Sequence, residues 1–118
     1  MKIVALFLAL LVGAQAAGPA NKVTTEIESL LTYLGGLDGA VFIRNGSEHT
    51  AKEAEAHVRM KWEKQADKIK TAEEFIALCA SQSSLSGTRY EIRLKAGKTV
   101  FADDLLKTEL VRMRDSKK

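Results

Sequence analysis

The sequence predicts an α+β fold in which four helices pack around a small antiparallel sheet of two or three strands. Three observations lead to this prediction. Apolar residues recur at helical spacing in four separate stretches, one segment alternates between apolar and polar residues, and one short run is almost entirely apolar. The length of 118 residues suits one domain with its own core.

The N-terminal segment carries the three parts of a secretory signal peptide. Lys2 supplies a positive charge, residues 3–12 are apolar, and Ala14-Gln15-Ala16 is a small-residue cleavage site. The apolar run is too short to span a bilayer as a helix, so we expect no transmembrane segment. We therefore predict a signal peptide at residues 1–16, cleaved after Ala16, a single α+β domain at residues 17–118, and a periplasmic or secreted protein. A buried N-terminal core helix is the alternative for the same run.

A linker at residues 17–21, which contains Pro19, leads into the first predicted helix. This helix should begin near Asn21 or Lys22 and end at Gly35-Gly36, because glycine readily adopts the left-handed conformation that closes helices. Its apolar stripe, which should face the core, consists of Val23, Ile27, Leu30, Leu31 and Leu34.

The apolar segment 40–44 predicts a buried strand, and Asn45-Gly46 after it predicts a turn. No apolar alternation follows this turn, so we expect it to lead into a helix rather than to close a hairpin. Thr50 and Glu53 have the spacing of a capping box at the start of that helix. The apolar stripe of the helix consists of Ala54, Val58, Trp62, Ala66 and Ile69.

The second half of the chain continues with alternating helix and strand signals. Thr71 and Glu74 have the spacing of a second capping box. The helix that follows them carries on one face Ala72, Phe75, Ile76 and Cys79. A serine-rich segment, 81–87, should end this helix. Residues 90–94 then alternate as a strand that should pair with the strand at 40–44 and form a hairpin with residues 99–100, before a last helix from about residue 102.

Composition narrows the range of partners. Lys and Arg number 18 and Asp and Glu 15, a net charge of +3, which is too balanced for a nucleic-acid-binding protein. Cys79 is the single cysteine, so no intramolecular disulfide is possible. Its position on an apolar helix face favours a buried thiol over a reactive or dimerising one. We expect a monomer.

No motif in the sequence specifies a reaction, a cofactor or a metal. His49, Glu53 and His57 are spaced like residues of a zinc-binding helix, but His49 precedes the predicted helix start and no third ligand is indicated. The serine-rich segment offers nucleophiles without the glycine-flanked elbow of hydrolases. We predict no catalytic residue, no cofactor and no metal site.

Two blocks of residues form a more specific pattern. The first block comprises Arg44-Asn45-Gly46, His49-Thr50, Glu53-Ala54, His57, Arg59 and Lys61. The second block comprises Thr71-Ala72-Glu73, Phe75-Ile76, Ala80-Ser81, Ser83-Ser84, Ser86-Gly87 and Tyr90. Together they resemble the YfeK-like family, a domain of unknown function found in small bacterial proteins with signal peptides. The resemblance implies export and a compact domain, and it implies no chemistry.

The polar residues of these blocks form the candidate site. Strand pairing should bring Arg44 near Tyr90, and the helix that covers the sheet presents His57 and Lys61 one turn apart. The candidate ligand-binding residues are Arg44, Asn45, His57, Lys61, Ser84 and Tyr90. We expect a binding or interaction module whose polar patch takes an anionic small molecule, a cell-wall fragment or a periplasmic protein. Two alternatives stay open: a small hydrolase-like enzyme that uses His57 with a loop serine, and a purely structural cluster.

Overall fold

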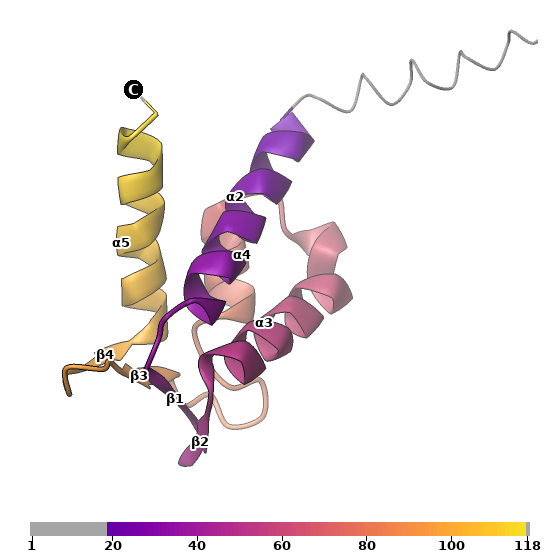
Figure 1. Cartoon of the computed structure of the whole chain (residues 1–118). Helices are drawn as coiled ribbons and strands as arrows, with labels where there is room; N and C mark the ends of the chain where they lie inside the picture. Colours follow the sequence, from indigo (N-terminus) through magenta and orange to yellow (C-terminus); the bar gives the residue numbers. More distant parts are fainter. Residues whose placement is uncertain (1–18, 118) are drawn as a thin grey trace, which may run out of the picture.

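Four helices stand on one side of a four-stranded antiparallel sheet in the computed structural model, which describes residues 19–117 (Figure 1). The α+β fold is confirmed, but the sheet has four strands rather than two or three. The predicted signal peptide and its cleavage site lie outside the described residues. No helix within residues 19–117 is long and apolar enough to cross a membrane. The elements in order are α2 (Pro19–Gly35), β1 (Val41–Arg44), β2 (Ser47–His49), α3 (Ala51–Gln65), the 3-10 helix η1 (Ala66–Lys68), α4 (Ala72–Cys79), β3 (Glu91–Arg93), β4 (Thr99–Phe101) and α5 (Ala102–Asp115).

Helix α2 begins earlier than predicted. Its first residue is Pro19, so residues 19–21 of the predicted linker are helical. Proline fits the first turn of a helix, because its fixed φ is helical and the N–H that it lacks would have no partner there. The end at Gly35 is as predicted, and the apolar stripe is buried at Ile27, Leu30, Leu31 and Leu34.

The turn at Asn45-Gly46 closes a β-hairpin, so the prediction that it leads directly into a helix is wrong. Both turn residues have positive φ, 51° at Asn45 and 79° at Gly46. Two-residue hairpin turns favour this backbone conformation. All three residues of β2 are polar, so β2 has no apolar alternation of its own, and its pairing with β1 makes it a strand.

The sheet has the order β2-β1-β3-β4, and all neighbouring strands are antiparallel. The predicted pairing between the strands near residues 41 and 92 is confirmed, as is the hairpin with residues 99–101. Phe42 lies opposite Ile92, and Ile92 lies opposite Val100, so these three side chains share the face that packs on the helices. Because side chains alternate along a strand, Arg44 lies on the same face as Phe42.

Helix α3 starts at the predicted capping box. Thr50 Oγ1 accepts a hydrogen bond from the Glu53 N–H at 3.1 Å, and the Glu53 carboxylate accepts one from the Thr50 N–H at 2.9 Å. The helix ends at Gln65, so the last two residues of the predicted apolar stripe, Ala66 and Ile69, lie beyond it. Ala66 is therefore exposed in η1, and Ile69 is buried from the segment that follows.

The hydrogen bonds at the N-terminus of helix α4 differ in part from the predicted capping box. Thr71 Oγ1 accepts from the Glu74 N–H at 3.0 Å, as predicted. The Glu74 carboxylate, however, accepts from the N–H of Lys70 rather than that of Thr71. The second capping box is therefore half formed, because the carboxylate reaches one residue further back along the chain.

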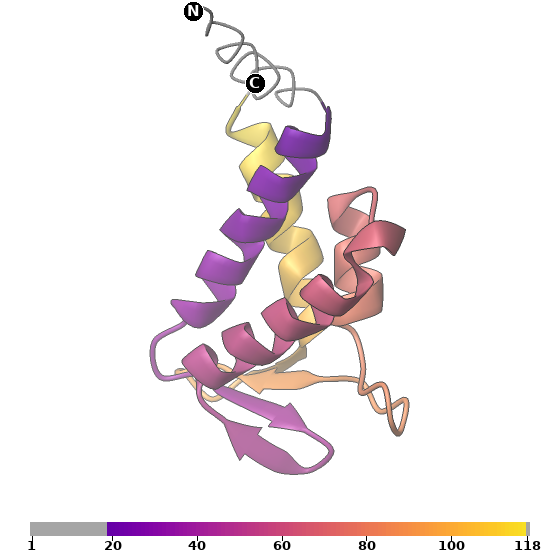
Figure 2. The same ribbon diagram turned by 90° about the vertical axis from the view of Figure 1, so that its right-hand side faces the viewer.

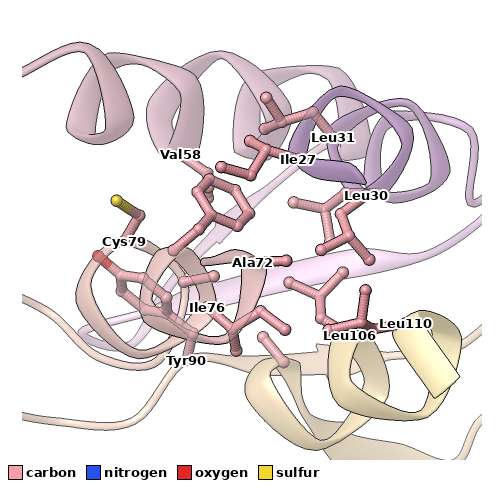
Figure 3. Packing of buried hydrophobic residues seen from close by; sticks show 14 of the residues in the cluster. Ile27, Leu30, Leu31, Val58, Ala72, Ile76, Cys79, Tyr90, Leu106 and Leu110 are labelled. Atoms are coloured by element: carbon pink, nitrogen blue, oxygen red, sulfur yellow. The ribbon is translucent and has the colours of Figure 1, made fainter. Parts of the chain in front are cut away.

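Helix α4 also supplies the centre of the core. Phe75, Ile76 and Cys79 have no exposed surface. Phe75 meets Trp62 of α3 edge to face, with ring centroids 6.1 Å apart. Figure 3 shows Cys79 at the same end of the core as Tyr90. The predicted buried thiol is confirmed, and burial raises the pKa of Cys79 to about 11.

An ion-pair network ties α2, α4 and α5 together. Glu26 of α2 is 3% exposed, and its two carboxylate oxygens accept hydrogen bonds from Arg114 of α5 at 2.8 and 2.9 Å. The Arg114 guanidinium also donates to Glu73 of α4 at 2.6 Å. These contacts join the middle of α2 to the first turn of α4 and the last turn of α5.

Candidate functional site

Four of the predicted site residues meet between helix α3 and the sheet. Arg44 ends β1, His57 and Lys61 lie on α3, and Tyr90 directly precedes β3. Figure 2 shows α3 running above the β1–β2 hairpin. His49 of β2 joins these residues through a contact with Arg44. We refer to these five residues as the Arg44 cluster.

Polar contacts run continuously through the Arg44 cluster. Arg44 Nη1 lies 3.2 Å from Nε2 and 3.3 Å from Nδ1 of His57. Arg44 Nη2 lies 3.4 Å from Nε2 of His49. His57 Nε2 is 3.2 Å from the Tyr90 hydroxyl, to which Lys61 Nζ donates a hydrogen bond at 3.1 Å. The contacts therefore connect two strands, helix α3 and the residue before β3.

The surroundings of His57 favour a neutral imidazole ring. Desolvation lowers the pKa of His57 most, and the nearby charges of Arg44 and Lys61 lower it further. A neutral ring keeps a lone pair that accepts a hydrogen bond from Arg44. A protonated ring has no such lone pair and repels the guanidinium.

Arg44 differs from the other arginines in the described part of the chain. Those arginines each lie within 3.1 Å of an Asp or Glu oxygen: Arg59, Arg89, Arg93, Arg112 and Arg114. Arg44 contacts two histidine rings instead. Lys61 is 7% exposed, and it donates to the Tyr90 hydroxyl and to the Gln82 carbonyl. The cluster therefore gathers two permanent positive charges whose described partners are neutral groups.

A pocket of about 40 Å³ opens beside the cluster. Arg44, His49, His57 and Tyr90 line it together with one acid, Glu53. The Glu53 carboxylate accepts a hydrogen bond from the backbone N–H of Thr50 at the start of α3 and lies 3.8 Å from His49 Nδ1. The rest of the lining is apolar and comes from β1, α2, α3, α5 and the residue after α4.

Asn45 and Ser84 lie outside the Arg44 cluster. Asn45 Nδ2 donates to Ser83 Oγ at 3.0 Å, and its Oδ1 accepts from Ser86 Oγ at 2.5 Å. Ser83 is 4% exposed, whereas Ser84 is exposed. Ser83, and not the predicted Ser84, is therefore the loop serine that points toward Asn45. The sequence could not distinguish the two serines, because a loop has no periodicity.

His49 was not among the residues predicted for the candidate site. His49 lies opposite Phe42, on the face of the sheet that packs on the helices, and is half-buried. It was missed because the hairpin was not predicted. The available signal was the dipeptide Asn45-Gly46, whose two-residue turn aligns His49 with Phe42.

The geometry limits the chemistry that the cluster supports. The hydroxyl in contact with His57 belongs to Tyr90, and Ser83 Oγ is engaged by Asn45. No group of three or more metal-ligating His, Cys, Asp or Glu side chains occurs among the described residues. The cluster instead presents N–H and O–H donors around positive charge, which is an arrangement suited to holding an anion.

The fold and the site define a class of protein: a small α+β domain with a cationic cluster beside an apolar pocket. The chain belongs to the family of unknown function DUF5329, whose model matches residues 21–114. It is also 37% identical over 90 residues to the protein named Uncharacterized protein YfeK of Salmonella typhimurium, covering 75% of each chain. These matches confirm the resemblance to the YfeK-like family. No solved structure matches the chain.

Proposed function

We propose that this protein is an exported binding module that takes a small anion at the Arg44 cluster. One observation carries the proposal. The five other described arginines pair with carboxylates, whereas the Arg44 guanidinium makes its polar contacts with the rings of His49 and His57. An oxyanion from solution would supply the negative partner that the other arginines have within the protein.

The environment of the cluster strengthens its attraction for an anion. Lys61 is 7% exposed, so little water screens its charge. Its hydrogen bond to the Tyr90 hydroxyl leaves the hydroxyl proton for His57 Nε2, which is 3.2 Å away, or for a further acceptor. The neutral His57 ring offers one N–H in the same place. An anion in the pocket would therefore meet donors from β1, α3 and the residue before β3.

A purely structural cluster is the competing explanation, and substitution of Arg44 separates the two. If the contacts of Arg44 mainly stabilise the fold, Arg44→Gln should lower the free energy of unfolding by about 1–3 kcal/mol, because the rings of His49 and His57 lose a donor. If the cluster is a binding site, the substitution should leave stability unchanged or raise it, since uncompensated charge is removed.

The binding test compares Arg44→Gln with Arg93→Gln. Arg93 is a matched control, because it lies on the opposite face of the same sheet and pairs with Glu48. Calorimetric titrations and thermal unfolding would use phosphate and acetate at constant ionic strength. An anion at 100 times its Kd should stabilise the wild-type protein and Arg93→Gln by about 2.7 kcal/mol. Arg44→Gln should not respond. Equal responses in all three proteins, or no response in any, would contradict the proposal.

Export is tested separately from binding. The charge, apolar run and small-residue site within residues 1–16 support it. The intact mass of protein recovered from the periplasm should lack those residues. A mass that includes them, or recovery from the cytosol alone, would count against export.

A further inference from the structure

We infer that the anion is a carboxylate joined to a short aliphatic group. The inference rests on the proposed function and deepens it, because it names the ligand class. It depends on the pocket beside the Arg44 cluster, which is lined by polar side chains, among them Arg44 and the acid Glu53, and by apolar side chains. A simple inorganic anion would fill only the polar part.

Small side chains create the apolar part of the pocket. Three alanines from different elements line it: Ala54 on α3, Ala80 after α4 and Ala102 at the start of α5. Larger residues complete the wall, among them Phe42 and Leu106. Ala80 and Ala102 are buried and Ala54 is half-buried, so the apolar wall of the pocket extends from the surface into the core. An aliphatic group placed there would leave water, which is favourable by about 0.8 kcal/mol per methylene.

The size of the pocket limits the length of the aliphatic group. A volume of about 40 Å³ has room for roughly three water-sized groups, since one water needs about 10–15 Å³. If the carboxylate lies against Arg44 outside this volume, two or three carbon atoms beyond it fill the pocket. A free short-chain acid has this shape, and so do the Cα and methyl group of a peptide's C-terminal alanine, whose amide would have to lie outside the pocket.

The polar part of the pocket matches a planar carboxylate. The Arg44 guanidinium is a planar fork of N–H donors, which pairs with both oxygens of a carboxylate. The Tyr90 hydroxyl and the His57 ring lie 3.2 Å from each other on the same wall and provide further donors. The carboxylate would thus face Arg44 and direct its aliphatic group toward Ala54.

The first experiment is a calorimetric titration of the protein with acetate, propionate, butyrate and hexanoate at constant ionic strength, with inorganic phosphate as a further anion. The Kd should fall about fourfold per added methylene, the fold-change that 0.8 kcal/mol represents, from acetate to butyrate. It should fall no further at hexanoate, because the pocket is full. N-acetylalanine distinguishes a peptide end from a free acid: it should bind at least as tightly as propionate only if a peptide end is the natural source.

The outcomes separate the inference from the proposal on which it rests. If phosphate and all the acids bind with one affinity that Arg44→Gln abolishes, the proposed function stands and the inference is overturned. If no anion binds, both fail. If the affinity for the acids increases with chain length up to butyrate, the result supports both the proposed function and the inference.

A second experiment fills the pocket without changing its charge. Ala54→Leu should abolish the gain in affinity from acetate to butyrate and preserve the binding of phosphate. Ala56→Leu is the matched control, since Ala56 lies on the same helix and is exposed. If the affinity of Ala54→Leu still increases from acetate to butyrate, the aliphatic group does not lie beside Ala54 and the inference is overturned. If Ala54→Leu does not fold, the titration of the wild-type protein with acids of increasing chain length is sufficient to test the inference.

Discussion

Asn45 and Ser83 are hydrogen-bonded across 38 residues of sequence, with Asn45 Nδ2 donating to Ser83 Oγ at 3.0 Å. The contact joins the β1–β2 turn to the serine loop that leads into β3. Ser83 Oγ also accepts from the N–H groups of Leu85 and Ser86. The turn and the loop therefore hold each other in place beside the Arg44 cluster.

Two substitutions of Asn45 separate this contact from the turn conformation. Asn45→Gly should lower the free energy of unfolding by about 1 kcal/mol, since it removes the side-chain hydrogen bonds and tolerates the φ of 51°. Asn45→Ala should cost about 1–2 kcal/mol more, because the left-handed conformation strains a residue with a Cβ. Urea unfolding measures both values, and equal stabilities for the two variants would contradict this assignment.

The packing of α4 predicts a large cavity effect. Phe75→Ala should lower the free energy of unfolding by about 3–5 kcal/mol, because Phe75 has no exposed surface and packs against Trp62. Leu85→Ala is the control, since Leu85 is 94% exposed and should contribute less than about 0.5 kcal/mol. A cost below about 1 kcal/mol for Phe75→Ala in urea unfolding would mean that α4 does not present this face to the core.

The Glu26–Arg114 pair predicts an asymmetry within one network. Arg114→Met should destabilise the protein by about 2–4 kcal/mol, because Glu26 is 3% exposed and would lose its partner. Glu73→Gln should cost less than about 1 kcal/mol, since the Glu73 side chain is 59% exposed and Arg114 keeps its bonds to Glu26. Chemical unfolding of both variants checks the prediction, and similar costs would argue against it.

His57 should make the stability of the protein depend on pH. In the unfolded chain a histidine takes up a proton near its ordinary pKa of 6.5, whereas folded His57 has a lower pKa. Between these two values the unfolded state binds more protons. The free energy of unfolding therefore falls as the pH drops from about 6.5 through the folded pKa, and it keeps the full contribution of His57 above about 6.5.

His57→Gln removes this titration and keeps an acceptor for Arg44. Urea unfolding between pH 7.5 and pH 5 should show a shallower loss of stability for the variant than for the wild-type protein, on the order of 1.4 kcal/mol less for each unit by which the pKa of His57 is lowered. Parallel curves for the two proteins would show that His57 takes up its proton equally readily in the folded and unfolded chains.

Local signals in the sequence were sufficient for most helices. The stripe of α2, the capping box at Thr50 and Glu53, and the buried face of α4 were all predicted, because helical periodicity and capping depend on residues within a few positions of each other. The central pairing of β1 with β3 followed from one apolar segment and one segment that alternates between apolar and polar residues. The early start of α2 at Pro19 and the end of α3 at Gln65 were not predicted, since helix ends carry weaker signals than helix interiors.

By itself, then, the sequence determined the α+β class, the core faces of the helices and the family. It also placed Arg44, His57, Lys61 and Tyr90 in one site, because strand pairing and helical spacing are readable from local patterns. Only the tertiary structure decided that β2 is a strand, that His49 faces Arg44, and that Ser83 rather than Ser84 meets Asn45. These residues are polar and have no apolar period of their own. Pairing with β1 across the two-residue turn therefore determines where β2 and His49 lie, and the packing of distant segments determines which serine meets Asn45.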